Sequence, residues 1–214
     1  MLVAAVGFGA WYVFGSKAPA KPKLVTTEPV DSGGPATPAG TWKVVPGKDV
    51  YVGYRMTEVF SGDVIHKTAV GRTPAVTGTL KIAGNQATVT DVTAQMQQLA
   101  SDRSARDNYI HTHAIESDKF PTSEFKLTEP ITLPAPLTKG ALAKVTATGS
   151  LTLHGVTRTI RVPLEARWNG STIDIDASDI PIVLADYKIE PPDTGVVKVD
   201  DHGSLEFALE FAPA

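Results

Sequence analysis

The sequence predicts an all-β fold in which antiparallel strands close into a barrel that carries one helical insertion. From Thr41 onward, apolar and polar residues alternate in run after run, the pattern of strands with one dry and one wet face. Turn-forming pairs such as Gly84-Asn85 and Asn169-Gly170 separate these runs. A closed barrel hides every sheet edge, and the sequence offers no second helix to cover an open sheet. We therefore favour a barrel over the alternative, a two-layer sandwich.

Length and composition narrow the classes of protein. The chain has 214 residues, 42% of them hydrophobic, and a formal net charge of -3. This is enough for one domain with a core and a tail, and it lacks the basic surface that nucleic-acid binding requires. There is no cysteine, which excludes disulfides, thiolate catalysis, cysteine-bound metals and acylation of a lipoprotein cysteine.

The first fifteen residues, MLVAAVGFGAWYVFG, carry no charged side chain and are predicted to form an apolar helix. At about 1.5 Å per residue this helix would span roughly 22 Å, which is short of a bilayer core of about 30 Å. A secretory signal would begin with a positive region, which is missing here. Residues 1–15 are therefore a membrane anchor whose true start lies upstream, a cleaved signal, or a buried helix of a soluble protein.

Residues 16–40 are rich in Pro, Gly, Ala and Thr and show no apolar period. Such a composition cannot bury a core, so we expect a flexible, extended linker. The globular domain is then predicted to occupy residues 41–214.

Four runs show the strand alternation most clearly, and the last of them, SLEFALEFA, has apolar and acidic residues on opposite faces. Glu206 and Glu210 are placed on its wet face. The residues predicted to share the dry faces are Val50, Val52, Tyr54 and Met56; Val76, Leu80 and Ile82; Phe125 and Leu127; and Leu205, Phe207, Leu209 and Phe211. We also interpret His202-Gly203 as a turn before this last strand.

The segment SDRSARDNYIHTHAIESDKFP is charged and irregular, and it follows a strand. Ser101 or Asp102 is a suitable N-cap for a short helix over residues 103–115. His111 and His113 fall inside this segment. On a strand they would share a face and could bind zinc, but on a helix they do not, so we expect no metal site.

TATGSLTLHGVTRTI, residues 146–160, predicts a hairpin with His154-Gly155 as a two-residue loop. Such loops need positive φ, which glycine adopts freely and histidine more readily than most residues. His154 is therefore interpreted as a turn residue. The loop pairs Leu153 with Val156, Leu151 with Arg158, Gly149 with Ile160, Ala147 with Val162 and Val145 with Leu164 on one side, and Thr152 with Thr157, Ser150 with Thr159 and Thr148 with Arg161 on the other. A slip by one residue would destroy this sorting of apolar from polar residues.

Arg158 is the one charged residue on the apolar side of this hairpin. Burying an unpaired guanidinium is very costly, so the side chain either reaches water at the rim of the barrel or meets the polar head group of a ligand at the mouth of an apolar cavity.

The ordered set of motifs resembles the YceI-like family of bacterial polyisoprenoid-binding proteins. The motif GSLTLHGVTRTI is joined by GYRM at 53–56, GRTPAVTGTL at 71–80, SDRSARDNYI followed by KFPTSEFKLTEPI, ADYKIEPP at 185–192, and DDHGSLEFALEF near the C-terminus. The resemblance covers residues 41–212 and leaves out the N-terminal segment and linker, which are similar to those of the membrane-anchored, exported members.

This resemblance implies a lipocalin-like up-and-down barrel of about eight strands around a long apolar cavity. The cavity would hold an isoprenoid chain such as a quinone or polyprenyl tail, and no catalytic residue comes with the motifs. The pair Arg106-Asp107 matches a family position. We interpret it as a structural salt bridge at the helix, or its aspartate as a cap or tie to the barrel end.

The inward parity of the strands gives the candidate cavity wall, in which small residues such as Gly149 and Ala147 leave room opposite larger ones. Asp174 and Asp176 share a strand face, which we interpret as a solvated face rather than an acid–base pair. The predicted wall residues are Val52, Tyr54, Leu80, Ile82, Phe125, Leu127, Leu151, Leu153, Ile160, Val162, Leu205, Phe207 and Leu209. Arg158 and Tyr187 are the predicted head-group contacts at the rim.

The expected function is that of an extracytoplasmic binding protein that holds a long isoprenoid lipid for transport, storage or protection. Its partners would be this lipid and, through residues 1–15, the cell membrane; a secreted or periplasmic protein is the alternative. We expect no nucleic acid, no catalytic residue, no metal and no cofactor other than the lipid. Two other functions stay open: an enzyme acting on such a lipid, and a structural cell-envelope module with a filled barrel.

Overall fold

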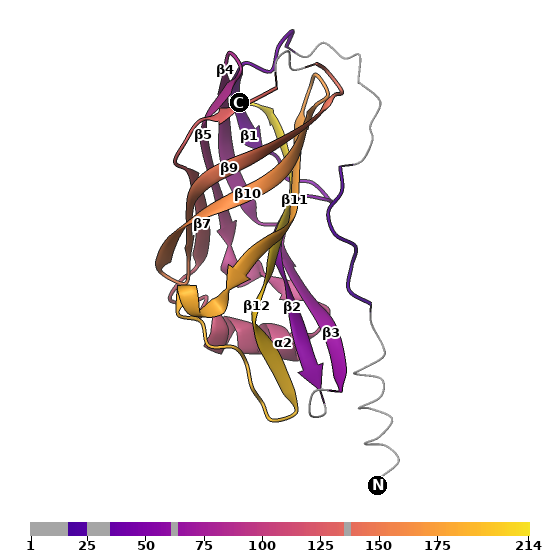
Figure 1. Cartoon of the computed structure of the whole chain (residues 1–214), viewed down its shortest axis with the longest axis vertical. Coiled ribbons are helices and arrows are strands. Elements are labelled where there is room, and N and C mark those ends of the chain that lie inside the picture. Colours follow the sequence, from indigo (N-terminus) through magenta and orange to yellow (C-terminus); the bar gives the residue numbers. More distant parts are fainter. Residues whose placement is uncertain (1–16, 25–34, 61–63, 135–137) are drawn as a thin grey trace.

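The computed structural model describes residues 17–24, 35–60, 64–134 and 138–214. Over these ranges the chain forms one curled antiparallel sheet and a short helical segment (Figure 1). The strands are β1 Gly40–Val44, β2 Tyr51–Phe60, β3 Ile65–Thr73, β4 Val76–Ala83, β5 Gln86–Gln95, β6 Ala100–Ser101, β7 Thr122–Leu127, β8 Ile131–Thr132, β9 Leu142–Leu153, β10 Val156–Trp168, β11 Ile173–Val183 and β12 Val197–Pro213. The helical elements are η1 Met96–Gln98, α2 Ser104–Tyr109, the π-helical turn η2 Ile110–Ala114, and η3 Leu184–Tyr187.

The sheet closes into an up-and-down barrel with eight strand positions, and four of these positions each hold two strands. β1 and β2 lie end to end along β12, and β4 and β3 lie end to end along β1 and β2. β5 and β6 continue this pattern along β4 and β3. β7 and β8 both pair with β5 and share the next position; β9, β10, β11 and β12 follow in chain order, and β12 meets β1 to close the ring. The pairing of β12 with β1 confirms the barrel over the sandwich. At the α2 end the ring is less complete, since β6 pairs with only two residues of β3.

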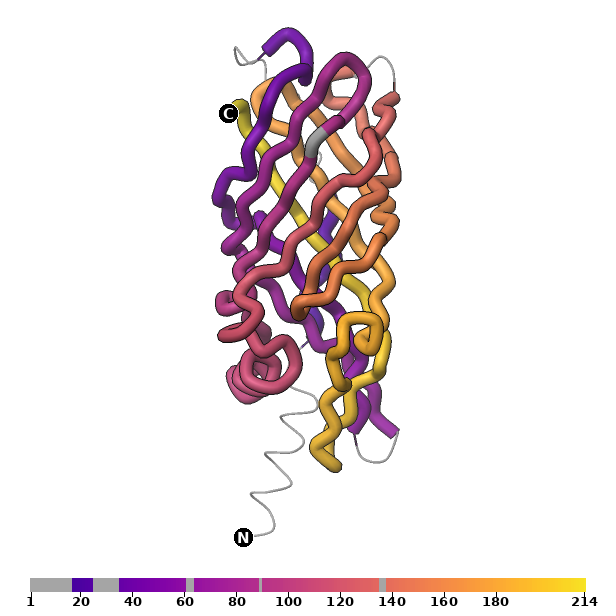
Figure 2. Tube along the Cα trace, turned by 90° about the vertical axis from the view of Figure 1, so that its left-hand side faces the viewer, coloured from indigo at the N-terminus to yellow at the C-terminus, as the bar shows by residue number. Residues whose placement is uncertain are grey.

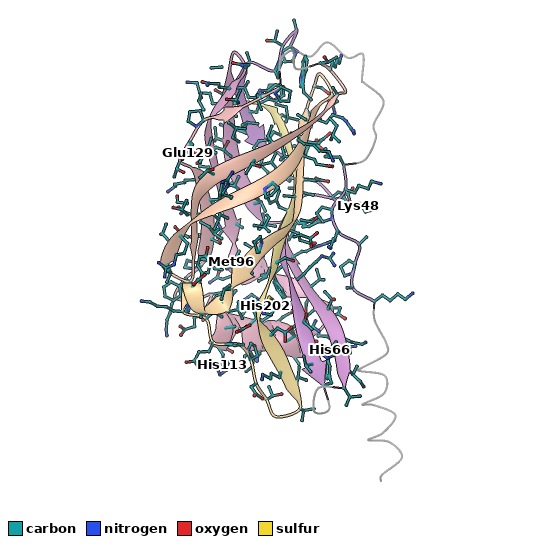
Figure 3. The ribbon with its side chains drawn as sticks, in the orientation of Figure 1. Lys48, His66, Met96, His113, Glu129 and His202 are labelled. Carbon is teal, nitrogen blue, oxygen red and sulfur yellow. The ribbon has the colours of Figure 1, made fainter. Side chains whose placement is uncertain are left out.

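The barrel is long, and its two ends differ (Figures 1 and 2). At one end, uppermost in Figure 1, lie β1, β4 and the C-terminus; we call this the β1 end. At the other, the α2 end, the helix lies across the barrel while β2, β3 and the start of β12 extend past it. Figure 3 shows Met96 close to the level of the helix and Glu129 nearer the β1 end.

The predicted hairpin is confirmed in every pair. β9 and β10 pair in the expected register, from Leu153 with Val156 through Leu151 with Arg158 to Val145 with Leu164. His154 and Gly155 have φ angles of 49° and 70°, the left-handed conformation that a two-residue loop requires. The alternation with a period of two was therefore sufficient to predict the register of β9 with β10.

Two local predictions are corrected. His202-Gly203 is not a turn: it lies inside β12, where the register with β2 shifts between Val199 and Gly203, so the glycine marks a bulge. The helix occupies the predicted segment, but its N-cap residue is Arg103, whose side chain makes no capping bond. Ser101 instead donates from its backbone N–H and hydroxyl to Asp107, at 2.8 and 2.6 Å.

Residues 17–24, part of the predicted flexible linker, lie along the outside of the barrel, where they contact β2, β3 and β11 (indigo in Figure 1); we call them the strap. They are extended, as expected, but held. Arg55 donates to the carbonyl of Pro19 at 2.6 Å and Arg72 to that of Ala20 at 2.7 Å. Lys21 pairs with Asp179 at 2.6 Å, and Leu24 is buried.

Residues 1–15, for which an apolar helix is predicted, lie outside the described residues. Within the described ranges, no helix has both the length and the apolar character to cross a bilayer.

Candidate ligand-binding site

Two apolar cavities occupy the inside of the barrel. The one toward the β1 end has a volume of about 140 Å³, and the one toward the α2 end about 340 Å³. The second lies within the range of small-molecule sites, about 300–1,000 Å³. An eight-stranded barrel can be filled by its own side chains or can hold a ligand, and this one retains internal space.

Every predicted wall residue lines one cavity or both. Tyr54 and Leu153 line the α2-end cavity. The β1-end cavity is lined by Leu80, Ile82, Phe125, Leu127, Ile160, Val162, Phe207 and Leu209. Val52, Leu151 and Leu205 line both. The alternation of each strand was therefore sufficient to identify its inward face.

The residues that line both cavities form a neck between them. These are Val52, Leu151 and Leu205, together with Ser123, whose hydroxyl donates to the carbonyl of Thr152 at 3.0 Å. Apart from Ser123 the neck consists of aliphatic side chains, which change rotamer without breaking a polar contact. A chain-like ligand can therefore extend from one cavity into the other once these side chains move apart.

Tyr54 is a polar group of the α2-end cavity. Its hydroxyl is buried and has no hydrogen-bond partner among the described residues. Its ring rests on Gly71, where a Cβ atom would come within 2.3 Å of it, so only glycine leaves room. Burial raises the pKa of Tyr54 well above its usual value, which keeps the hydroxyl protonated and able to donate.

Arg106 and Glu58 fix the helix to the cavity wall. Arg106, on α2, donates two hydrogen bonds to the carboxylate of Glu58 on β2, at 2.6 and 2.8 Å, and also pairs with Asp102. The predicted salt bridge at the helix therefore exists, but Arg106 makes it with Glu58 and Asp102. Asp107 ties the helix to β6 through Ser101, as the alternative interpretation expected.

Trp168, the last residue of β10, lines the β1-end cavity and is 5% exposed. Its indole Nε1 is buried without a hydrogen-bond partner in the part of the chain that the structure describes. Leaving such a donor unpaired costs about 1–3 kcal/mol. Tyr54 in the wall of the α2-end cavity and Trp168 in the wall of the β1-end cavity thus carry buried donors for which the described residues offer no hydrogen-bond partner.

Arg158 and Tyr187, the predicted head-group contacts, line neither cavity. Arg158 is exposed, and its Nε donates to the carbonyl of Asp186 at 3.1 Å. Tyr187 is buried in the core, 3% exposed. Of the two outcomes considered for Arg158, the side chain takes the one that reaches water.

His154 does more than turn the chain. Its Nδ1 lies 3.0 Å from the carbonyl oxygen of Tyr187 and its Nε2 lies 3.1 Å from the carboxylate of Glu116, while Phe120 packs edge-on against its ring. The hairpin loop is therefore tied both to η3 and to the segment that follows the helix.

The other histidines, like Asp174 and Asp176, line neither cavity. His111 contacts the hydroxyl of Ser117 and the carbonyl of Leu99, and His113 stacks on Tyr109 (His113 is labelled in Figure 3). Among the described residues no group of three possible ligands is placed to hold a metal ion.

The solvated face predicted for Asp174 and Asp176 is only partly correct. Asp176 is 9% exposed, and burial with Asp174 and Glu165 nearby raises its pKa to about 6. Glu206, also placed on a wet face, is fully buried. Glu206 belongs to β12, where Arg55 and Arg72 both pair with its carboxylate and the strap lies over these arginines.

Several lining residues were missed at the sequence level. Trp168 continues the inward parity of Ile160 and Val162 along β10, so extending that alternation would have found it. Met96, Tyr109 and others near the helix line the α2-end cavity, and no strand pattern identifies them.

The fold and site define a closed β-barrel with an internal, largely apolar binding cavity, and comparisons with known proteins agree. The family model for the YceI-like domain matches residues 49–211, so the chain belongs to the YceI-like family. No curated protein sequence matches the chain closely enough for comparison.

Solved structures show the same fold at low sequence identity. A polyisoprenoid binding domain from Saccharophagus degradans is 15% identical, with a TM-score of 0.62, over 81% of this chain and 98% of that one. BcnA from Burkholderia cenocepacia is 19% identical, with a TM-score of 0.53, over 73% and 95%. The YCEI protein of Campylobacter jejuni is 17% identical, with a TM-score of 0.52, over 67% and 84%.

Proposed function

We propose that this protein binds a long isoprenoid lipid, of quinone or polyprenyl type, inside the barrel and shields it from water. The observation that carries the proposal is the pair of adjoining cavities whose walls come from inward-facing apolar residues. Each methylene taken from water contributes about 0.8 kcal/mol, so a long chain gains affinity along its length. The description of the Saccharophagus degradans relative as a polyisoprenoid binding domain supports the same ligand class.

Tyr54 is the group best placed to meet the polar end of the lipid. It lines the wider cavity, close to α2, and its protonated hydroxyl lacks a protein partner among the described residues. A carbonyl or hydroxyl oxygen of a quinone or polyprenol would satisfy it.

A binding role fits the polar groups better than catalysis does. Arg106 and Glu58 are engaged with each other, and the raised pKa of Tyr54 disfavours the phenolate that a base would need. The remaining internal space also argues against a structural module with a filled barrel.

Lipid mass spectrometry of the purified full chain tests this function. We expect one isoprenoid lipid per protein, and we expect it to be lost from Leu151→Trp, which fills the neck. Leu142→Trp places the same side chain at an exposed position of the same strand and should retain the lipid. Wild-type protein that is empty and also refuses an added isoprenoid quinone would contradict the proposal.

We propose further that the barrel works outside the cytoplasm, held at the membrane by residues 1–15 or released after their cleavage. The missing cysteine is compatible with export, since the fold needs no disulfide. Fractionation of cells that express the chain with a C-terminal tag tests this. Tagged protein found only in the cytoplasmic fraction would overturn it.

A further inference from the structure

The indole of Trp168 carries an N–H donor, but an isoprenoid tail is a hydrocarbon and has no acceptor for it. The indole lies in the wall of the β1-end cavity, whose other walls are mostly aliphatic and aromatic side chains. A ligand that enters past α2 with its head group at Tyr54 would bring only hydrocarbon to this end. The buried N–H would then stay unpaired even in the complex.

Trp42 is a second buried tryptophan near this end of the barrel, and it can be compared with Trp168. The register runs from Trp168 through Ile173 to Phe211 and Val44, which places Trp42, two residues before Val44, at nearly the same level. Trp42 is 1% exposed and Trp168 is 5% exposed, so both are buried.

The indole N–H of Trp42 is satisfied: it donates to the carbonyl of Pro38 at 2.8 Å. Ser123, at the neck, likewise donates to Thr152. Trp42, at a similar level of the barrel, and Ser123, in the cavity wall, are thus paired within the protein, whereas Trp168 Nε1 has no hydrogen-bond partner among the described residues. An indole N–H can only donate, so the missing partner is an acceptor.

We propose that the β1-end cavity is a subsite for an oxygen atom on the far end of the ligand chain, which accepts a hydrogen bond from Trp168 Nε1. This inference rests on the proposed lipid-binding function and narrows it to chains oxygenated at the end remote from the head group. A hydroxyl or keto oxygen serves, whereas a carboxylate is disfavoured because the apolar walls would desolvate its charge.

The test compares two probes, farnesol and its ω-hydroxylated form, for binding to the full-length protein by calorimetry. A hydrogen bond contributes about 0.5–1.5 kcal/mol, so the wild type should bind the ω-hydroxylated form about 2–10-fold more tightly. Trp168→Phe removes the N–H and keeps an aromatic ring, and it should abolish this preference. Trp42→Phe is the matched control and should retain it.

A second measurement does not depend on the folding of a variant. The chain has only three tryptophans, Trp11, Trp42 and Trp168, so the NMR spectrum of the wild-type protein contains few indole N–H signals to follow. The ω-hydroxylated probe should move the Trp168 signal downfield, and farnesol should not.

Equal binding of the two probes, or a preference that survives in Trp168→Phe, overturns the subsite and leaves the lipid-binding function standing. Failure of the wild type to bind either probe or any isoprenoid quinone overturns both.

Discussion

A buried hydroxyl without a partner raises the free energy of a protein with an empty cavity, and Tyr54 carries such a hydroxyl. We therefore expect Tyr54→Phe to leave the stability of the lipid-free protein unchanged or slightly higher, while affinity for an isoprenoid quinone falls about 2–10-fold. Thermal unfolding and calorimetry measure the two effects.

Arg158→Leu is the comparison for this variant. Because Arg158 lies outside both cavities and contacts Asp186, its loss should leave quinone affinity unchanged. If Arg158→Leu lost affinity and Tyr54→Phe did not, the head-group assignment made from the sequence would be right and the present one wrong.

The raised pKa of Asp176 predicts how the stability of the folded protein depends on pH. The pKa of Asp176 in the folded protein is raised to about 6, so near pH 5 the folded protein holds a proton that the unfolded chain has released. The stability that this group contributes is therefore present at low pH and lost as pH rises through about 6. Asparagine does not ionise, so Asp176→Asn should be more stable than the wild type by on the order of 1 kcal/mol at about pH 7.5, and little different at about pH 4.5.

Urea unfolding at the two pH values checks this, and Asp179 supplies a control of opposite sign. The hydrogen bond from Lys21 lowers the pKa of Asp179, so its contribution is present near neutral pH and lost on acidification. Asp179→Asn should therefore weaken the fold at about pH 7.5, where Asp176→Asn strengthens it. A wild-type-like Asp176→Asn at both pH values would contradict the raised pKa.

At the scale of elements, variants in the loop of the β9–β10 hairpin can test the turn conformation and the tertiary contacts of the loop separately. Asn-Gly is the best two-residue loop, so His154→Asn should preserve or improve the turn. It nevertheless removes the contacts of the imidazole with Tyr187 and Glu116. We expect a net loss of about 1–2 kcal/mol in the free energy of unfolding, because each hydrogen bond contributes about 0.5–1.5 kcal/mol.

Denaturant unfolding of His154→Asn measures this loss. Gly155→Ala is the companion variant. The added Cβ would lie 2.6 Å from Phe120, on a residue whose φ of 70° is left-handed. This variant should lower the free energy of unfolding by straining the turn. A His154→Asn protein as stable as the wild type would mean that His154 is only a bend.

The same hairpin shows how far sequence reasoning reaches. Alternation specifies which residues of a strand share a face, so the register of β9 with β10 and the inward wall residues were predictable. The pair Pro46-Gly47 indicated a turn between β1 and β2, but the end-to-end placement of these two strands along β12 was not predictable, because it depends on where neighbouring strands diverge. The burial of Glu206 was not predictable either, since a segment more than 180 residues away in sequence covers the arginines that pair with it.

At the scale of the whole molecule, the strap joins the N-terminal region to the barrel wall. Arg55 and Arg72 each contact both the buried carboxylate of Glu206 and a carbonyl of the strap, so the strap completes the shell around this carboxylate. Both arginines lie on the strands, β2 and β3, that extend past α2 beside the wider cavity. Strap attachment and the rigidity of that cavity wall are therefore linked.

Replacing residues 17–24 in the full chain with eight Gly and Ser residues tests this link. Burying a leucine such as Leu24 contributes about 1.5–3 kcal/mol, so the replacement should lower the free energy of unfolding by about 2 kcal/mol and speed hydrogen exchange in β2 and β3 more than in β9 and β10. Lys23→Ser, at an exposed position of the strap, should change neither measurement. Unchanged unfolding and exchange in the replaced chain would show that the strap adds nothing to the barrel, and the predicted linker would then be the right description of this segment.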